Sequence, residues 1–404
     1  MFSAKIRKLF SYKFLLINSV AWFLLTWMIL SSVVEMLSFF YFFVASLLYY
    51  GGLVGSALLG VIWLHENLRK KFFLFFWVST GICSCILAAF LLPYATLLSV
   101  VISALILGVS VGINMPACLS FIGHYTKVEG RGRTSAIIFF AVQLITALLY
   151  APLISLDMRM RFLILAMWRL SGVASIFLFN FEEKPFKEHK IFSFFSILSE
   201  RSFILYFSSW FLFCLINFIE IPVIRRFLGP DLFSSHIIST FIISSISAYF
   251  GGILCDLKGR RTTSIIGFIL LGIGYAALSL FAGTQLSIFI YTLLDGIAWG
   301  ILYVVFIFVI WGDLSENKNR ERYYLIGGMP FLFSGLIEVV VEPFVEFIPI
   351  YTSFSLASFC LFLAVLPLLY APETLPEKII RHRELKEYIE KAKRIREKYE
   401  KEKD

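Results

Sequence analysis

The sequence is short of charge and of long polar stretches. Only 16% of its 404 residues are Asp, Glu, Lys or Arg, and 59% are hydrophobic. A soluble domain carries about a quarter of charged residues. A chain with so little charge lacks the polar surface that a water-soluble domain of this length needs. The composition therefore predicts a protein embedded in a lipid bilayer.

The sequence also lacks the short motifs of several enzyme classes. It has no G-x-x-x-x-G-K-[ST] loop for binding ATP phosphates, and His65-Glu66 is not followed by the second histidine of a zinc protease. It has no G-x-S-x-G turn of the hydrolases. Its six cysteines lie within or beside apolar runs, and its five histidines are scattered singly. We therefore predict no enzymatic activity, no cofactor and no metal site.

Apolar runs long enough to cross a bilayer recur along almost the whole chain. A spanning helix needs about 20 predominantly apolar residues. The first run, 14–34, is longer than the apolar core of a signal peptide and is interpreted as a span. We predict an all-α membrane protein with twelve transmembrane helices. The predicted spans are 14–34, 37–63, 72–92, 95–118, 134–155, 161–180, 203–223, 236–255, 264–282, 285–311, 324–344 and 349–371.

Lys and Arg are distributed unequally between the two sides of these spans. The N-terminal segment, the loops after even-numbered spans and the C-terminal tail hold 31 of the 36, whereas the other side holds four. An excess of Lys and Arg marks the cytoplasmic side. We predict a multi-pass protein of a prokaryotic cell membrane with both termini in the cytoplasm. Arg169 lies inside span 6, where we expect it to snorkel or to pair structurally.

Two loop segments of the first half are matched in the second half. Glu182-x-x-Pro185 matches Glu373-x-x-Pro376 at an offset of 191, and Glu129-x-Arg131-x-Arg133 matches Glu316-x-Lys318-x-Arg320 at an offset of 187. Each offset links loops that are six spans apart, which is typical of parallel-repeat transporters. We predict two pseudo-symmetric six-helix bundles at 1–180 and 203–371, a cytoplasmic linker at 181–202 and a charged helical tail at 372–404.

The loop between spans 8 and 9 carries an unusual concentration of charge. It contains Gly252-x-x-x-Asp256-x-x-Gly259-Arg260-Arg261, which resembles the signature loop of the major facilitator superfamily. Pro372-Glu373-Thr374 after span 12 resembles the PET motif of its sugar-porter and organic-ion branches, and the segment 129–133 resembles its acidic loop after span 4. The resemblance covers the whole chain. It implies a transporter in which this loop acts as a latch that steadies one conformation.

The residues of this predicted latch have physical roles. Gly252 allows a neighbouring helix to approach closely, and Gly259 allows a turn with positive φ. Asp256 can accept hydrogen bonds from the N-terminus of a neighbouring helix. The resemblance implies that this neighbour is span 5, which starts just after Arg131 and Arg133.

Arg260 and Arg261 have two interpretations. They pair with acids such as Glu129 or with lipid phosphates, or they serve only as topological anchors. The corresponding loop of the first half, 64–71, reads LHENLRKK and has no Asp-x-x-Gly. The sequence therefore predicts an intact latch in the second half only.

Three polar side chains lie deep within the predicted spans. A charge at the bilayer centre costs roughly 2.5–3.5 kcal/mol on insertion scales, so such residues usually face a cavity or a partner. Asp295 in span 10 is our first candidate for proton coupling or cation contact, and Glu338 in span 11 is the second. Gln143 in span 5 can donate and accept hydrogen bonds to a substrate. Helix packing is the alternative for Asp295 and Gln143.

Aromatic and acidic side chains complete the candidate site. Trp22 and Trp27 in span 1, Trp210 in span 7 and Trp299 in span 10 offer stacking surfaces, with packing as the alternative. An acidic vestibule on the predicted external side would favour cations. The acids near span ends on that side are Glu35, Glu220, Glu342 and Glu346.

These features predict a secondary active transporter that moves a small organic solute by alternating access and is coupled to protons. The PET-like motif favours sugars or organic ions, and the absence of Gly and Pro from 134–150 disfavours the drug/proton antiporter branch. Efflux of amphipathic compounds and a non-transporting receptor or scaffold are the alternatives. We expect a monomer in the lipid bilayer. The net charge of +9 reflects topology and not nucleic-acid binding.

Overall fold

The computed structural model describes residues 4–63, 71–178, 193–281, 283–315 and 319–376 and four positions of the tail, with side chains from Tyr12 onward. Its described residues contain twelve spans that are long and apolar enough to cross a membrane, which confirms the predicted number. Several extend further than predicted. Span 7 covers Arg201–Leu228, so Arg225 and Arg226 lie in its last turn rather than in a loop.

The first six spans are formed by α1 to α7. Each predicted apolar run lies largely within these helices, as a backbone in lipid must satisfy its polar groups within a helix, but α1 begins ten residues before its run and span 4 ends seven residues after its run. Span 4 is interrupted after Gly112, where Pro116 lies in the first turn of the next helix. The elements are α1 (Ala4–Glu35), α2 (Phe39–Trp63), α3 (Lys71–Leu91), η1 (Leu92–Tyr94), α4 (Leu97–Gly112), α5 (Met115–Tyr125), η2 (Val128–Gly130), α6 (Arg131–Ile154) and α7 (Met158–Leu178).

The last six spans follow a short helix, α8 (Phe194–Leu198), which precedes span 7. Span 10 is interrupted like span 4, here by a stretch of wider π-helical turns, η3. Such irregular turns are frequent at functional positions of helices. The elements are α9 (Arg201–Leu228), α10 (Pro230–Lys258), α11 (Arg260–Leu280), α12 (Gln285–Tyr303), η3 (Val304–Val309), α13 (Ile310–Leu314), α14 (Arg320–Val341), η4 (Glu342–Phe347), α15 (Ile350–Leu363) and α16 (Val365–Tyr370).

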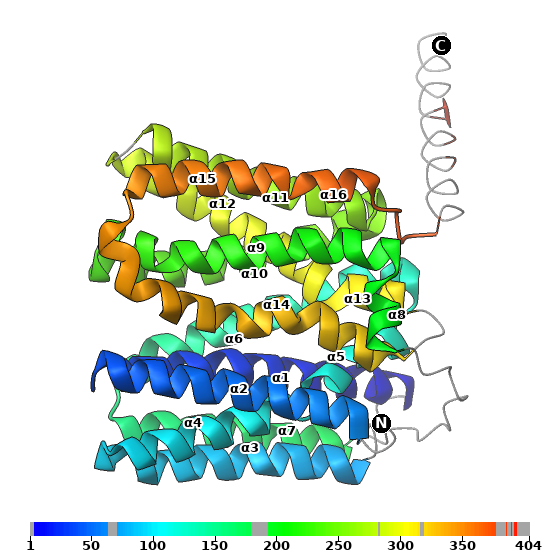
Figure 1. Ribbon diagram of the computed structural model, residues 1–404. Helices are drawn as coiled ribbons and strands as arrows, with labels where there is room; N and C mark the ends of the chain where they lie inside the picture. The colour runs from blue at the N-terminus through cyan, green and yellow to red at the C-terminus, as the bar shows by residue number, and fades with distance from the viewer. Residues whose placement is uncertain are drawn as a thin grey trace, which may run out of the picture.

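The helices pack as two groups, with α1–α7 below and α9–α16 above in Figure 1. Within the first group α2 packs on α4, and α3 and α1 pack on α7. Within the second group α10 packs on α12, and α11 and α9 pack on α15. Each pair of the second group corresponds to a pair of the first after a shift of six spans. The packing therefore repeats as the loop offsets of the sequence predict.

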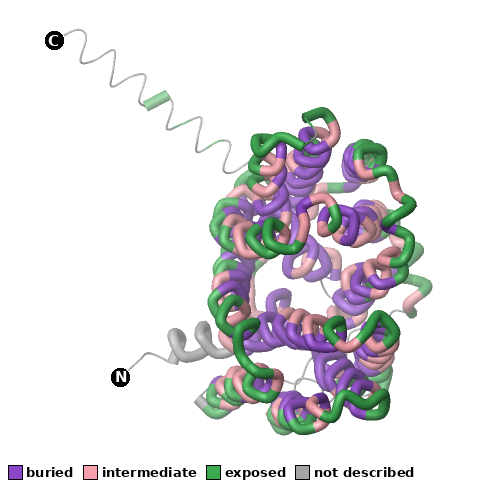
Figure 2. The backbone as a smooth tube through the Cα atoms, turned by 90° about the vertical axis from the view of Figure 1, so that its left-hand side faces the viewer, coloured by how far each residue is buried: buried purple, intermediate pink, exposed green. Residues whose placement is uncertain are grey.

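Two helix pairs make the largest contacts between the groups. One is α6 with α10, and the other is α2 with α14. A shift of six spans converts one pair into the other. Seen end-on, buried positions lie where the helices face one another, and exposed positions lie mainly on the outside (Figure 2). The outer positions include large apolar side chains such as Phe72 and Phe90, which suit contact with lipid tails.

One end of the bundle is rich in basic residues. The helices α3, α6, α9, α11 and α14 each begin there with a Lys or an Arg. We call this the basic end; it is the right-hand end in Figure 1. We call the other end the distal end.

The segment just after span 12 packs against the basic end. Ala371, the last residue of the predicted bundle, is buried, and so is Leu375, which lies within the tail predicted at 372–404. Apart from those four tail positions, residues 377–404 lie outside the described residues, as do the first-half loop at 64–70 and residues 179–192 of the linker region.

Candidate functional site

A cavity of about 520 Å³ lies between the two groups of helices. Its lining includes Glu35 at the end of α1, Arg225 in the last turn of α9 and Pro230 at the start of α10. All three positions are at the distal end of the bundle. The cavity is therefore open toward the distal end. It is lined from both groups, by α1, α2 and α6 on one side and by α9, α10, α11, α12 and α14 on the other.

Aromatic side chains close the deep end of this cavity. The rings of Phe23 on α1 and Phe331 on α14 meet edge to face across the two groups, with 6.0 Å between centroids. Tyr303 packs on Phe331 at 5.2 Å. The same three residues also line a small apolar void on the other side. They form an aromatic floor that separates the cavity from the basic end.

Asp295 lies in the wall of the cavity and is only 3% exposed. Its Oδ1 accepts a hydrogen bond from Trp299 Nε1 at 2.8 Å. Its Oδ2 lies 3.4 Å from Thr240 Oγ1 and 3.6 Å from His236 Nε2, both on α10. No Lys or Arg of the described residues pairs with this carboxylate. Burying a carboxylate without a cation costs free energy unless a proton or another cation neutralises it.

Gln143 joins the two groups of helices at the same cavity. Its Nε2 donates a hydrogen bond to Ser244 Oγ on α10 at 2.8 Å, so the helix-to-helix contact considered as an alternative does exist. The side chain also lines the cavity. Its buried Oε1 accepts no hydrogen bond from any described residue. Gln143 therefore bridges two helices and keeps one free acceptor.

Glu338 lies at the mouth of the cavity, where it is held by Arg225 at 2.5 Å. Arg225 also pairs with Glu342 at 3.1 Å and approaches Glu35 of the first group at 3.9 Å. The four side chains make an ion-pair cluster around one guanidinium. Glu220 was expected with these mouth acids but is buried, where it accepts a hydrogen bond from Ser353 at 2.5 Å.

The predicted tryptophans fall into two sets. Trp299 and Trp27 line the cavity. Trp210 is buried below the aromatic floor, where it stacks on Phe306 with 5.0 Å between centroids. Trp22 is buried inside the first group and donates to Cys85 Sγ. Trp22 and Trp210 are therefore packing residues that do not line the cavity, and they are not in position to stack on a solute there.

The basic end is closed by contacts between the groups. Asp256, at the end of α10, accepts hydrogen bonds from the backbone N–H groups of Gly132 at 2.9 Å and Arg133 at 3.0 Å, in the first turn of α6. This is the contact with span 5 that the sequence predicts. A side chain at Gly252 would collide with Ala136 and with the carbonyl of Gly132, so α6 and α10 approach closely only because position 252 lacks one.

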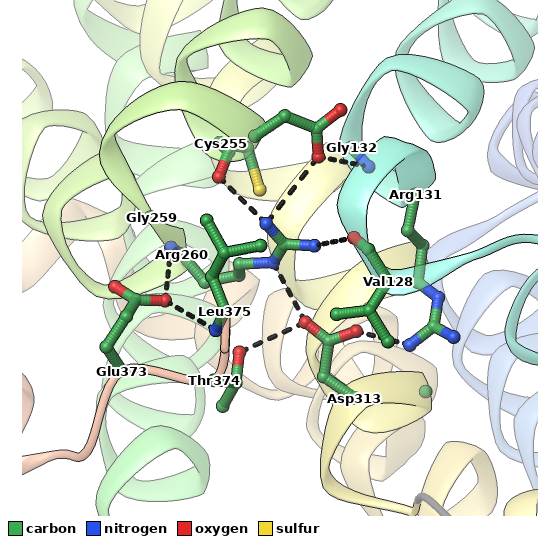
Figure 3. Close-up of polar contacts among 12 residues, drawn as sticks. Val128, Arg131, Gly132, Cys255, Gly259, Arg260, Asp313, Glu373, Thr374 and Leu375 are labelled. Carbon is green, nitrogen blue, oxygen red and sulfur yellow. Dashed lines mark hydrogen bonds and ion pairs between the residues drawn. The ribbon is translucent and has the colours of Figure 1, made fainter. Parts of the chain in front are cut away.

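Asp313 connects the arginines of the two groups. It forms an ion pair with Arg131 and accepts a hydrogen bond from Arg260 Nε at 2.8 Å (Figure 3). Arg260 Nη2 in turn donates to the carbonyl of Val128 at 2.5 Å. From the sequence we named acids such as Glu129 as partners of Arg260 and Arg261; the acids that Arg260 contacts in the structure are Asp313 and Asp256. Span 10 extends three residues beyond its predicted end. Asp313 therefore lies at the end of a helix, where its carboxylate contacts the guanidinium groups of both Arg131 and Arg260.

The PET-like motif belongs to the same cluster. Glu373 accepts hydrogen bonds from the backbone N–H groups of Arg260 at 2.8 Å and Arg261 at 3.1 Å, so it caps the N-terminus of α11. Gly259 precedes this turn with a φ of 95°, in the region that favours glycine. Any side chain at Gly259 would also collide with the Glu373 carboxylate. Thr374 Oγ1 donates to Asp313 at 3.0 Å.

Asp313 was not among the predicted residues, although one feature of its position points to a cationic partner. An acid in the last turn of a helix faces the negative end of the helix dipole and is unfavourable there without a cation. Asp313 occupies such a position at the end of span 10. His236 was set aside as a lone histidine, and only its neighbours on α12 reveal its place beside Asp295.

The comparisons with known proteins agree with this architecture. A family model of the Major Facilitator Superfamily matches residues 43–304, more than half of the chain. A search of curated protein sequences finds no match. Among solved structures, the chain is similar to the human organic anion transporter MFSD10 (TETRAN), with 14% identity and a TM-score of 0.68 over 91% of this chain and 100% of that one.

Two sugar symporters have the same fold. The proton:xylose symporter XylE bound to 6-bromo-6-deoxy-D-glucose is 16% identical, with a TM-score of 0.70 over 91% of this chain and 96% of that one. The E. coli fucose:proton symporter FucP is 13% identical, with a TM-score of 0.68 over 90% and 98%. At these identities the likeness shows the fold alone.

Twelve spans in two repeated groups, with a cavity between them, define a membrane transporter of the two-bundle type. The chain belongs to the major facilitator superfamily, whose members are transporters and not enzymes.

Proposed function

We propose that this chain is a secondary active transporter that moves one small organic solute at a time by alternating access. The observation that carries the proposal is the cavity between the two groups of helices, open at the distal end and closed at the basic end. In the alternative conformation the contacts of Asp256 and Asp313 break and the basic end opens. The predicted latch, Gly252 to Arg261 with Glu129, Arg131 and Arg133, then holds the closed state of that end.

We further propose that Asp295 is the proton-coupling residue. Its carboxylate is buried, lines the cavity and has no Lys or Arg partner among the described residues. Glu338, the second candidate, is held by the cation of Arg225, so its negative charge already has a partner within the protein. We therefore assign coupling to Asp295 and a role in the mouth cluster to Glu338.

The proposed orientation places the basic end in the cytoplasm, because Lys and Arg concentrate there. The cavity then faces the outside, and the chain acts as a monomer in the plasma membrane. A reporter fused to the C-terminus, active only on one side of the membrane, tests this orientation. Activity on the external side would contradict it.

Flux through purified protein in proteoliposomes tests the function itself. Labelled sugars, carboxylates and amines are offered singly, without a proton gradient and with a gradient in either direction. We expect one class to accumulate and the gradient to change its rate in the parent chain but not in Asp295→Asn. Asp231→Asn, on an exposed acid at the start of α10, is the matched control. A chain that binds a solute without carrying it across the vesicle membrane is a receptor, and the proposal fails.

A further inference from the structure

One face of α10 organises the polar wall of the cavity. His236, Thr240 and Ser244 follow one another at intervals of four residues, so their side chains stack along one face of the helix. His236 and Thr240 approach Asp295 on α12, and Ser244 holds Gln143 of α6. Asp295 and Gln143 are therefore held on neighbouring turns of α10, and both line the same cavity.

Both residues present acceptors to a solute. Asp295 offers a carboxylate, and Gln143 offers a buried Oε1 that no described residue satisfies. Gln143 is only 2% exposed, and an unpaired buried acceptor costs about 1–3 kcal/mol. A solute that fits this pair must donate hydrogen bonds to both. An acceptor-only solute such as a carboxylate leaves both unsatisfied.

The charge of the lining also favours a positive solute. The acids Glu35, Asp295 and Glu338 line the cavity, and among its described lining residues Arg225 is the one Lys or Arg. That guanidinium is already engaged by Glu338 and Glu342. No unengaged positive charge of the described lining residues is therefore available to hold an anion.

Aromatic rings from both groups of helices line the same cavity as the acceptor pair. Trp27 packs on Tyr50 with 4.7 Å between centroids on one side, and Trp299 packs on Tyr303 at 4.5 Å on the other. All four line the cavity. The faces of Trp and Tyr rings attract organic cations. The cavity thus combines a carboxylate, a neutral acceptor and an aromatic wall.

We propose that the solute is an organic ammonium ion with an apolar or aromatic body, and that its charged group and the coupling proton share the carboxylate of Asp295. This inference rests on the proposed function, which supplies the movement across the membrane. When the ammonium ion binds, its N–H group donates to the carboxylate and the proton leaves the Asp295 carboxylic acid for solution. One cation replaces one proton, so the transporter is an exchanger of organic cations for protons.

The titratable groups that face Asp295 come from three helices. They are His236 on α10, Tyr275 on α11, and Tyr291 and Tyr303 on α12. The tyrosines stay protonated near neutral pH. His236 is the group that competes with Asp295 as the source of a released proton, so a His236→Gln variant is included in the test.

Isothermal titration calorimetry of the full chain in detergent tests the proposal with three probes of similar size. They are benzylamine at a pH where it is protonated, benzyl alcohol and phenylacetate. Each titration is run in two buffers of different ionisation enthalpy, because the difference in heat reports the protons released. We expect benzylamine to bind best, with release of about one proton per cation.

The variants locate the site. Asp295→Asn should weaken benzylamine binding at least tenfold and abolish proton release, because a charge-assisted hydrogen bond is lost. Asp295→Glu should retain both, His236→Gln should retain proton release, and Asp231→Asn should behave like the parent. Gln143→Leu should weaken the binding of benzylamine but leave the number of protons released per bound cation unchanged.

Several outcomes overturn the proposal. Binding of benzyl alcohol or phenylacetate as tight as that of benzylamine refutes the cation class, as does the absence of benzylamine binding to protein that melts normally. Binding without proton release refutes the shared carboxylate. The calorimetry measures binding alone, so benzylamine binding with no flux in proteoliposomes would refute the proposed function and leave the assigned ligand class standing.

Discussion

Arg131 at the start of α6 and Asp313 at the end of α13 form an ion pair between the two groups of helices. Both side chains are almost fully buried, at 2% and 1% exposed. Asp313 also binds Arg260 and Thr374, so one carboxylate links the first group, the second group and the segment after span 12. Removing one member of a buried pair leaves an uncompensated charge and costs about 3–5 kcal/mol.

Asp313→Asn should open the basic end. Ser120 provides a reporter, because it is buried on α5 and approaches Glu321 of α14 across the two groups. In a background without native cysteines, Ser120→Cys should react with a polar thiol reagent at least about tenfold faster when Asp313→Asn is present, as a loss of 1.4 kcal/mol already shifts an equilibrium tenfold.

The matched control for Asp313→Asn is Glu342→Gln, which removes an acid from an arginine cluster at the distal end. It should leave the reactivity of Ser120→Cys unchanged. Equal reactivity of Ser120→Cys with and without Asp313→Asn would show that this carboxylate does not keep the basic end closed.

Asp256 and Glu373 each cap the N-terminus of a helix, Asp256 at α6 and Glu373 at α11. Each accepts two backbone N–H groups at the start of a helix, but Asp256 caps a helix of the other group whereas Glu373 caps one of its own group. Loss of a cap costs about 0.5–2 kcal/mol. Asp256→Ala should therefore speed the labelling of Ser120→Cys, while Glu373→Ala should lower the melting temperature without changing the labelling.

Scanning fluorimetry and thiol labelling on the same two preparations check this contrast. Gly51→Ala is a suitable reference, since a side chain there meets no atom within 4 Å. If Glu373→Ala speeds the labelling as much as Asp256→Ala, the cap on α11 also depends on the conformation, and the distinction drawn here is wrong.

The twelve spans and the six-span repeat could be predicted because they depend on apolar run length and loop offsets. The contact of Asp256 with span 5 could be predicted because the loop between spans 8 and 9 resembles a signature loop whose position in the family is known. Asp313 and Glu373 could not be placed, since their partners come from segments 53 and 113 residues away. Trp22 and Trp210 look like Trp299 in sequence, because an apolar helix gives no sign of which side faces a cavity.

The aromatic floor should control leakage through the transporter. Phe331 is partly buried and contacts Phe23, Tyr303 and Trp210, and replacing a packed Phe by Ala removes these ring contacts and leaves a gap. Phe331→Ala should join the main cavity to the apolar void on its other side. We expect the solute to leak through the variant, so that its flux depends less on the proton gradient. The measured quantity is the ratio of solute flux with the gradient to solute flux without it, which should move toward one.

Phe211→Ala is the control for the floor, because Phe211 is 46% exposed on the outside of α9. It should leave that ratio unchanged. A Phe331→Ala transporter with the parent ratio would indicate that the contacts of the basic end alone hold back the solute.

For Arg169 the sequence offered two options, snorkelling or structural pairing, and the structure shows structural pairing with neutral groups. It does not snorkel, as it is fully buried, and its hydrogen-bond acceptors among the described residues are neutral side chains, not Asp or Glu. Its guanidinium lies 4.4 Å from the ring centroids of both Trp22 and Trp77 and donates to Asn18 Oδ1 at 2.9 Å and Ser19 Oγ at 2.8 Å. The cation is thus held by two ring faces and two neutral acceptors.

This arrangement predicts an order of stability for two variants. Lys keeps the buried charge but loses the flat group that fits between the rings, so Arg169→Lys should melt well below the parent. Arg169→Met removes the charge and keeps most of the volume, and replacing buried charges by apolar residues is often nearly neutral. We therefore expect Arg169→Met to melt above Arg169→Lys in scanning fluorimetry. The reverse order would mean that the positive charge itself, rather than its packing between the rings, stabilises the first group of helices.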